Sequence, residues 1–160
     1  MATVSVQEDG GGDYLTLNAA FVASETDIEI EGEWDNPDII EATCSTANTT
    51  VTAIGSSKHP GHDNDVGTPT HYRLHGDGTH CITVSADDLT LDGLDIRQVG
   101  SGASDECIRM ADEGGTLTIQ NCLIHSDRAA NDQDGLYAGD INCTVNVINC
   151  FIYLRNNRSS

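Results

Sequence analysis

A repeat with a fixed period dominates the second half of the chain. Three segments align without gaps and begin at positions 89, 117 and 145, so each starts 28 residues after the previous one. In each copy the first, third, sixth and eighth residues are apolar, as in LTLDGLDI at 89–96. This pattern predicts two short alternating strands that meet at a two-residue corner. A gapless period of this length favours a repeat fold, in which the same structural unit stacks on its neighbour.

The corner of each copy holds a residue that tolerates left-handed backbone geometry, namely Gly93, Asn121 or Asn149. We therefore predict a one-residue left-handed bend between the two strands. A shorter third strand precedes each copy, at 81–84, 107–110 and 135–138. Three short strands per period, with Asn or Gly at one corner, are typical of a right-handed parallel β-helix, in which each coil stacks on the next.

The predicted fold class is therefore all-β, a right-handed parallel β-helix of about five or six coils. A short capping helix is expected near 17–23, with Thr16 as its N-cap. We expect a single domain over residues 1–160, with the cap in 1–26, the coils in 27–160 and a loop rich in His, Asp, Gly and Pro at about 56–70. A β-sandwich would not keep a gapless period, and an α/β fold would need longer amphipathic helices.

Residues at equivalent repeat positions should stack along the axis of a β-helix. Asn121 and Asn149 are predicted to form an asparagine ladder, and Cys122 and Cys150 an inward ladder beside it. Adjacent coils lie about 4.8 Å apart, so a disulfide is within reach. Free thiols are nevertheless favoured for all six cysteines, because they lie in or beside apolar runs, form no C-x-x-C pair and follow no export signal.

Acidic residues far outnumber basic ones. The chain has 26 Asp and Glu against 7 Lys and Arg, for a formal net charge of −19. Such a surface repels phosphate backbones and anionic lipid, so we expect neither nucleic acid nor membranes as partners. No apolar run approaches the roughly 20 residues of a spanning helix, and we expect no signal peptide.

The charge pattern also predicts how stability depends on salt. Two interpretations remain open, an ordinary acidic surface and a salt-adapted one, the second because the chain has Lys58 as its single lysine beside 26 acidic residues. Because salt screens the repulsion among surface carboxylates, we expect the melting temperature to rise between low and molar sodium chloride. Scanning calorimetry over that range checks this, and a flat or falling melting temperature would refute salt adaptation.

Five of the six histidines lie between positions 59 and 80. Four of them, His59, His62, His71 and His75, are spaced so that imidazoles and one carboxylate could hold a zinc or nickel ion. The competing interpretation is an exposed irregular loop, because Gly and Pro are frequent there. The acidic segment 127–140 is a similar candidate for calcium, against plain turns. No cofactor is required by any motif.

The last repeat predicts an apolar edge. By alternation, Phe151 and Tyr153 point outward, above Leu123 of the preceding coil. An open last coil exposes unpaired backbone groups and core side chains, and only a short polar stretch follows it. We expect Leu123, Phe151, Tyr153 and Leu154 to meet another subunit, another protein or a continuation of the chain.

The N-terminal part resembles a known group of β-helix proteins. VSVQEDGGGDYLTLNAAF at 4–21 is similar to the opening of pectin methylesterases, where a strand, a Gly-Asp-Tyr turn and a short helix cap the first coil. DIEIEGEW at 27–34 and TVTAIG at 50–55 resemble their next strands. The resemblance implies a pectin-lyase-like solenoid. It implies no catalytic residues, because the esterase and lyase motifs of that superfamily are missing.

The whole chain looks like small β-helix virion proteins of tailed viruses of bacteria and archaea. The strings that carry this resemblance are YRL at 72–74, LTLDGLDI at 89–96 and NCFIY at 149–153. It implies a non-enzymatic decoration, fibre or spike protein at the virion surface. The partners implied are a capsid protein or further copies of the chain, such as a trimer, and a host-surface glycan.

One alternative from another class stays open. The chain would then be a fragment of a carbohydrate-active enzyme, or a glycan-binding module, with the coil face as its groove. Such a groove would gather carboxylates and aromatic rings on one face. With two Phe, one Trp and four Tyr in the chain, platforms for sugar stacking are scarce.

Overall fold

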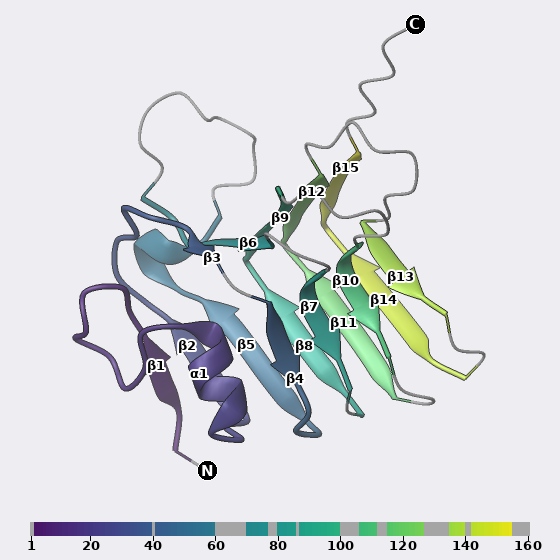
Figure 1. Ribbon diagram of the computed structural model, residues 1–160, viewed down its shortest axis with the longest axis horizontal. Coiled ribbons are helices and arrows are strands. Elements are labelled where there is room, and N and C mark those ends of the chain that lie inside the picture. The colour runs from purple at the N-terminus through teal and green to yellow at the C-terminus, as the bar shows by residue number, and fades with distance from the viewer. Residues whose placement is uncertain are drawn as a thin grey trace, which may run out of the picture.

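The computed structural model describes residues 2–39, 41–59, 70–76, 80–85, 87–99, 106–111, 115–126, 135–139 and 142–154. Within these residues strands make up about half of the protein, and α1 is the one α-helix. Its strands form three parallel sheets, and every strand pair is parallel. The strands follow one another along the long axis of the molecule from the N-terminus to the C-terminal end (Figure 1).

Each sheet takes its strands from successive parts of the chain. The six-stranded sheet contains β1 (Val4–Val6), β2 (Asp27–Ile30), β5 (Thr49–Ala53), β8 (Leu89–Asp92), β11 (Thr116–Gln120) and β14 (Thr144–Ile148). The five-stranded sheet contains β3 (Asp38–Ile39), β6 (Arg73–Gly76), β9 (Asp95–Gln98), β12 (Leu123–Ser126) and β15 (Phe151–Leu154). The four-stranded sheet contains β4 (Ala42–Cys44), β7 (His80–Val84), β10 (Glu106–Met110) and β13 (Leu136–Ala138).

From β2 onward the chain visits the three sheets in a constant order. It passes from the six-stranded sheet to the five-stranded sheet, then to the four-stranded sheet, and returns to the six-stranded sheet for the next round. The predicted three strands per repeat are confirmed, because each predicted segment is a strand in one of the three sheets. This arrangement is compatible with a parallel β-helix.

The sequence period sets the register of pairing. Leu89 lies beside Leu117 and Leu117 beside Val145, so from β8 to β14 each neighbour in the six-stranded sheet is 28 residues further along the chain. The same step relates Asp95 and Leu123 in the five-stranded sheet. Because a shift of one residue would turn the apolar side chains outward, the alternating pattern and the period specify the same register.

The predicted left-handed corners are also confirmed. Gly93, Asn121 and Asn149 have φ angles of 78°, 54° and 50°, and they lie between the six-stranded and the five-stranded sheet. A second set of left-handed residues precedes strands of the six-stranded sheet, including Asp88 with φ 56° and Gly115 with φ 78°. Glycine adopts this conformation without a steric clash because it has no Cβ atom, and Asn and Asp tolerate it better than other residues do.

The expected capping helix is α1 (Leu17–Val22). Thr16 is its N-cap, and its hydroxyl accepts a hydrogen bond of 3.2 Å from the Ala19 amide. The helix packs against β1 and β4 beside the first strands of the sheets (Figure 1). Leu17, Ala20 and Phe21 face the interior. No helix in the described part of the chain is long and apolar enough to cross a membrane.

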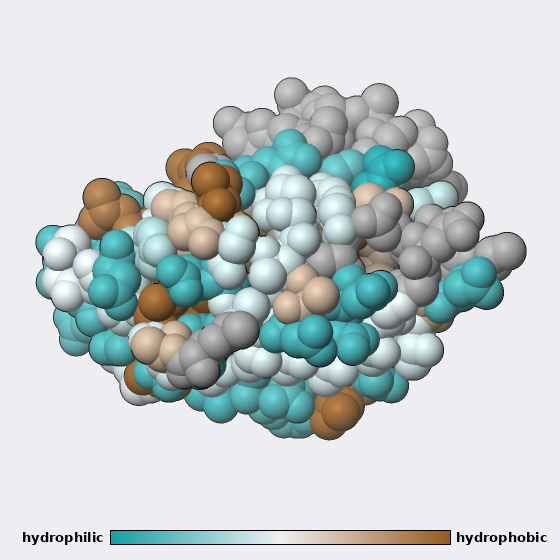
Figure 2. All heavy atoms as spheres, turned by 90° about the horizontal axis from the view of Figure 1, so that it is seen from below, coloured by the Kyte–Doolittle hydropathy of each residue, from teal (hydrophilic) through white to brown (hydrophobic). Residues whose placement is uncertain are grey.

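The inward side chains of all three sheets form one apolar core. Leu91, Ile119, Ile82 and Ile96 are fully buried members of this cluster. All six cysteines are free thiols, and Cys81 lies beside Cys107 in the register of β7 and β10. Much of the outer surface is hydrophilic, and on the face seen in Figure 2 the apolar residues form separate patches.

Candidate functional site

Polar and charged side chains gather on the outer side of the five-stranded sheet. One row along this sheet runs Arg73, Asp95, Leu123 and Phe151, and the next outward row includes His75 and His125. Asp95 and His125 point away from the apolar core, yet they are only 5% and 2% exposed. Charged side chains are seldom buried outside an apolar core, so this face is the candidate functional site.

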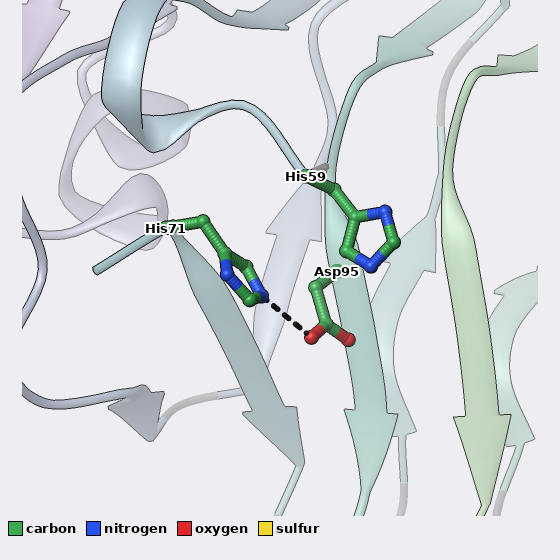
Figure 3. Close-up of side chains that lie close together, drawn as sticks. All are labelled: His59, His71 and Asp95. Atoms are coloured by element: carbon green, nitrogen blue, oxygen red, sulfur yellow. Dashed lines mark hydrogen bonds and ion pairs between the residues drawn. The ribbon is translucent and has the colours of Figure 1, made fainter. Parts of the chain in front are cut away.

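Three side chains converge at the centre of this face. The ligand atoms of His59, His71 and Asp95 all lie within 4.8 Å of one another. His71 Nε2 is 3.0 Å from Asp95 Oδ2, and the two imidazole rings meet edge to face with centroids 5.2 Å apart. Figure 3 shows the three side chains turned toward one another, with the dashed line joining His71 to the carboxylate.

Backbone contacts fix the two histidines over β9. The 3-10 helix η1 (Gly55–Ser57) begins at the left-handed Gly55, and the His59 amide then donates to the Gly93 carbonyl at 2.9 Å. The Tyr72 amide donates to the Ser57 carbonyl at 3.0 Å. This bond joins the segment before residue 60 to the segment after residue 69. His59 and His71 therefore reach Asp95 from anchored positions.

A third imidazole approaches the other oxygen of the same carboxylate. His125 Nε2 lies 3.3 Å from Asp95 Oδ1, and neither atom has a hydrogen bond of good geometry to another group. Burial alone would raise the pKa of Asp95, but the imidazoles of His125 and His71 outweigh it and hold that pKa well below its usual range. Asp95 is thus an ionised carboxylate surrounded by imidazole.

The remaining histidines of the segment 59–80, of which His62 and His75 were predicted as ligands, differ from this group. His75, on β6, does not belong to the group formed by His59, His71 and Asp95. Burial, followed by the charge of Arg97, lowers the pKa of His75 to about 4, so its imidazole is neutral at neutral pH. His80 lies on the four-stranded sheet, where its Nδ1 is 2.5 Å from Glu106 Oε2. His62 and most of the acidic segment 127–140 lie outside the described residues.

The predicted ladder residues Asn121 and Asn149 stack at the corner between the six-stranded and the five-stranded sheet. Asn149 Nδ2 donates to Asn121 Oδ1 at 2.8 Å, and Asn121 Nδ2 donates to Asp92 Oδ1 at 2.8 Å. Lys58 Nζ lies 3.8 Å from the same Asp92 oxygen. The hydrogen bonds therefore run through three coils and end at Asp92, the residue before Gly93, which occupies the ladder position in its coil.

Cys122 and Cys150 lie directly inside this ladder. Cys122 is buried, whereas Cys150 is partly exposed. The hydrogen bond between the two thiols lowers the pKa of Cys150 to about 6 and raises that of Cys122, whose burial acts in the same direction. Cys150 is therefore the thiol of this pair that ionises first.

A pocket connects the ladder with the histidine cluster. It has a volume of about 210 Å³, and its lining consists of His59, Asn121, Cys122, Asn149, Cys150 and Phe151. His59 thus belongs both to the pocket and to the group around Asp95. The pocket offers soft sulfur, amide and imidazole groups to a small ligand or ion.

The predicted interface residues differ in their exposure. Phe151 and Tyr153 are 58% and 43% exposed, with their rings stacked at a centroid distance of 6.5 Å. Leu123 lies beside Phe151 in the register, but it is 2% exposed, so the protein's own atoms cover it. Leu154 is the last residue of β15, and its side chain lies outside what the structure describes.

Sequence reasoning found two members of the cluster and missed the third. It considered carboxylates near the histidines in the chain, whereas Asp95 comes from β9, 24 residues after His71. One signal was present in the repeat, where Asp95 occupies the position of Leu123 and Phe151. An acidic residue there differs from the apolar pattern of the later copies.

Comparisons of the chain with models of protein families, with curated proteins and with solved structures find no match in any of the three.

Proposed function

We propose that this chain is a structural or attachment module, a right-handed parallel β-helix whose last coil docks onto another protein subunit. The observation that carries the proposal is the exposed apolar edge at the C-terminal end of the sheets. β13, β14 and β15 are each the terminal strand of their sheet. The exposed apolar side chains there are Val147, Ile148, Phe151, Ile152 and Tyr153, each at least 43% exposed.

Two physical effects, strand pairing and the burial of apolar surface, favour a partner at this edge. The outer side of a terminal strand presents backbone donors and acceptors that can pair with another strand. Neighbouring apolar side chains gain free energy when a partner removes them from water. The resemblance to virion β-helix proteins makes a capsid protein or a further copy of the chain the expected partner.

For the isolated 160-residue chain, the expected partner is a second copy. The N-terminal end carries α1, so a head-to-tail contact between the two ends is disfavoured, and the two C-terminal edges are left to meet each other. Contact through the same surface on both copies gives a closed two-fold dimer.

We predict that wild-type protein shows twice the mass of one chain by light scattering and that Phe151→Ser with Tyr153→Ser returns it to a monomer. A matched control is Leu15→Ser with Val22→Ser, because Leu15 and Val22 are 58% and 76% exposed and lie at the other end of the molecule. The control should keep the wild-type mass. A wild-type chain that stays monomeric at high concentration, or a dimer that survives the edge substitutions, contradicts the proposal.

The stacked pair Phe151 and Tyr153 favours one second candidate, a glycan-binding module. Two exposed parallel rings beside a pocket lined by Asn149 and His59 resemble a platform for a sugar ring. In that case the same double substitution would abolish binding to a glycan array without changing the mass of the protein.

A further inference from the structure

We propose that His59, His71 and Asp95 form a binding site for a divalent transition-metal ion, with Zn²⁺ as its occupant. None of its ligands belongs to the exposed edge of the proposed function, although His59 and Phe151 line the same pocket. The ligand atoms lie within 4.8 Å of one another. Tetrahedral zinc with bonds of about 2.0 Å requires ligand atoms roughly 3.3 Å apart. Small side-chain rotations therefore suffice to close the group around an ion.

The buried carboxylate of Asp95 favours a cation at this point. Asp95 is 5% exposed, and its Oδ1 has no hydrogen bond of good geometry. A buried charge is costly unless it is compensated, and a metal ion held by Asp95, His59 and His71 would compensate it more fully than neutral imidazoles do. His125 Nε2, 3.3 Å from Oδ1, holds the carboxylate in its present orientation toward His59 and His71.

The donor set selects the class of metal. Two imidazole nitrogens and one carboxylate oxygen suit zinc and its neighbours in the first transition row, whereas calcium and magnesium prefer oxygen ligands. Three protein ligands leave a fourth position of a tetrahedral ion for water. His59 also lines the pocket of about 210 Å³, which places one ligand beside an open space.

The ion would join segments that are distant in the sequence. His59 and His71 come from the two sides of residues 60–69, and Asp95 comes from β9. A shared ion therefore fixes both sides of this insertion to the five-stranded sheet. Metal that binds only the folded state stabilises that state in proportion to its affinity.

The test uses the full chain without a histidine tag. Titration calorimetry of metal-free protein with Zn²⁺ is expected to give one site, and a hundredfold excess over Kd should raise the melting temperature by about 5 °C or more. Co²⁺ in the same site should give the visible absorption of a four-coordinate ion. Ca²⁺ should produce neither effect.

The variants His71→Gln and Asp95→Asn should each weaken zinc binding by about 100-fold or more, since loss of groups that only support a ligand already costs 10-fold to 100-fold. The matched controls His75→Gln and His80→Gln should keep wild-type affinity, because these histidines lie outside the group. Far-UV circular dichroism verifies that each variant is folded.

Absence of zinc binding by the wild type overturns the proposal. So does equal binding by His71→Gln and Asp95→Asn, which would indicate adventitious binding by the acidic surface. If Asp95→Asn does not fold, His71→Gln decides, because His71 is partly exposed and takes no part in the core. The mass measured by light scattering is independent of these outcomes, so failure of the metal site and failure of the proposed function are distinguishable.

Discussion

Replacing Ile119 with alanine is expected to lower the free energy of unfolding by about 2–5 kcal/mol. Ile119 is fully buried on β11, between Leu91 of the preceding coil and Val147 of the next. Its loss removes apolar contacts and leaves a cavity between stacked coils, where neighbouring strands are held by their backbone ladders and cannot collapse into the space. Urea unfolding followed by circular dichroism measures the change.

The matched control is Ile39→Ala. Ile39 is also an isoleucine in a strand, but it is 61% exposed on β3. The expected loss there is within about 0.5 kcal/mol. Similar losses at Ile119 and Ile39 would mean that the inward faces of the three sheets do not form the core described above.

Asp38→Ala is expected to lower the free energy of unfolding by about 2–4 kcal/mol. Asp38 Oδ2 accepts a hydrogen bond of 3.0 Å from the Leu17 amide at the start of α1, and a second of 3.1 Å from the Tyr72 hydroxyl. The Tyr72 side chain is fully buried, so alanine leaves its hydroxyl without a partner. Thermal and urea unfolding at neutral pH give the loss.

Asp38→Asn separates the hydrogen bonds from the charge. Both bonds end on one oxygen, which the asparagine carbonyl can replace, so this variant should stay within about 1 kcal/mol of the wild type at pH 7. Burial raises the pKa of Asp38 above its usual value despite these bonds. A raised carboxyl pKa means that the folded state binds the proton more tightly than the unfolded state does.

The stability of the wild type relative to Asp38→Asn therefore depends on pH. The contribution of protonated Asp38 is fully present below the usual pKa of 3.8 and is lost as the pH rises through the higher folded-state value. The wild type should therefore gain stability relative to Asp38→Asn as the pH falls through this range. A difference between the two proteins that is constant with pH would contradict the raised pKa.

Local sequence determined the repeating unit of this protein. Alternation of apolar residues fixes which side chains of a strand face inward, as at Leu91 and Ile119, and it does so within a few residues. Gly93, Asn121 and Asn149 fix the bends because their backbone preferences are intrinsic. The spacing of 28 residues sets the register from β8 to β11 to β14, so the strands, corners and pairing of the three copies were predictable, whereas the N-terminal strands pair at other spacings.

Of the candidate site, His59 and His71 were predictable from the sequence and Asp95 was not. The alternating pattern says which side chains point outward, but it does not say which of these another segment covers. An outward side chain in a strand is exposed or covered according to where a distant segment folds. His59 and His71 cover Asp95 because backbone contacts through Ser57 and Gly93 anchor them over β9. The sequence around Asp95 contains no sign of that contact.

Exposure at the edge was also decided by the tertiary structure. Ile152 has an inward position by alternation, like Ile124 in the preceding coil, yet it is 43% exposed where Ile124 is fully buried. The two residues have the same local pattern and differ only in their neighbours. Ile124 lies between β9 and β15, whereas Ile152 lies on a terminal strand. Burial depends on stacking from both sides, so the sequence by itself determined the coil and the tertiary structure decided which surfaces were covered.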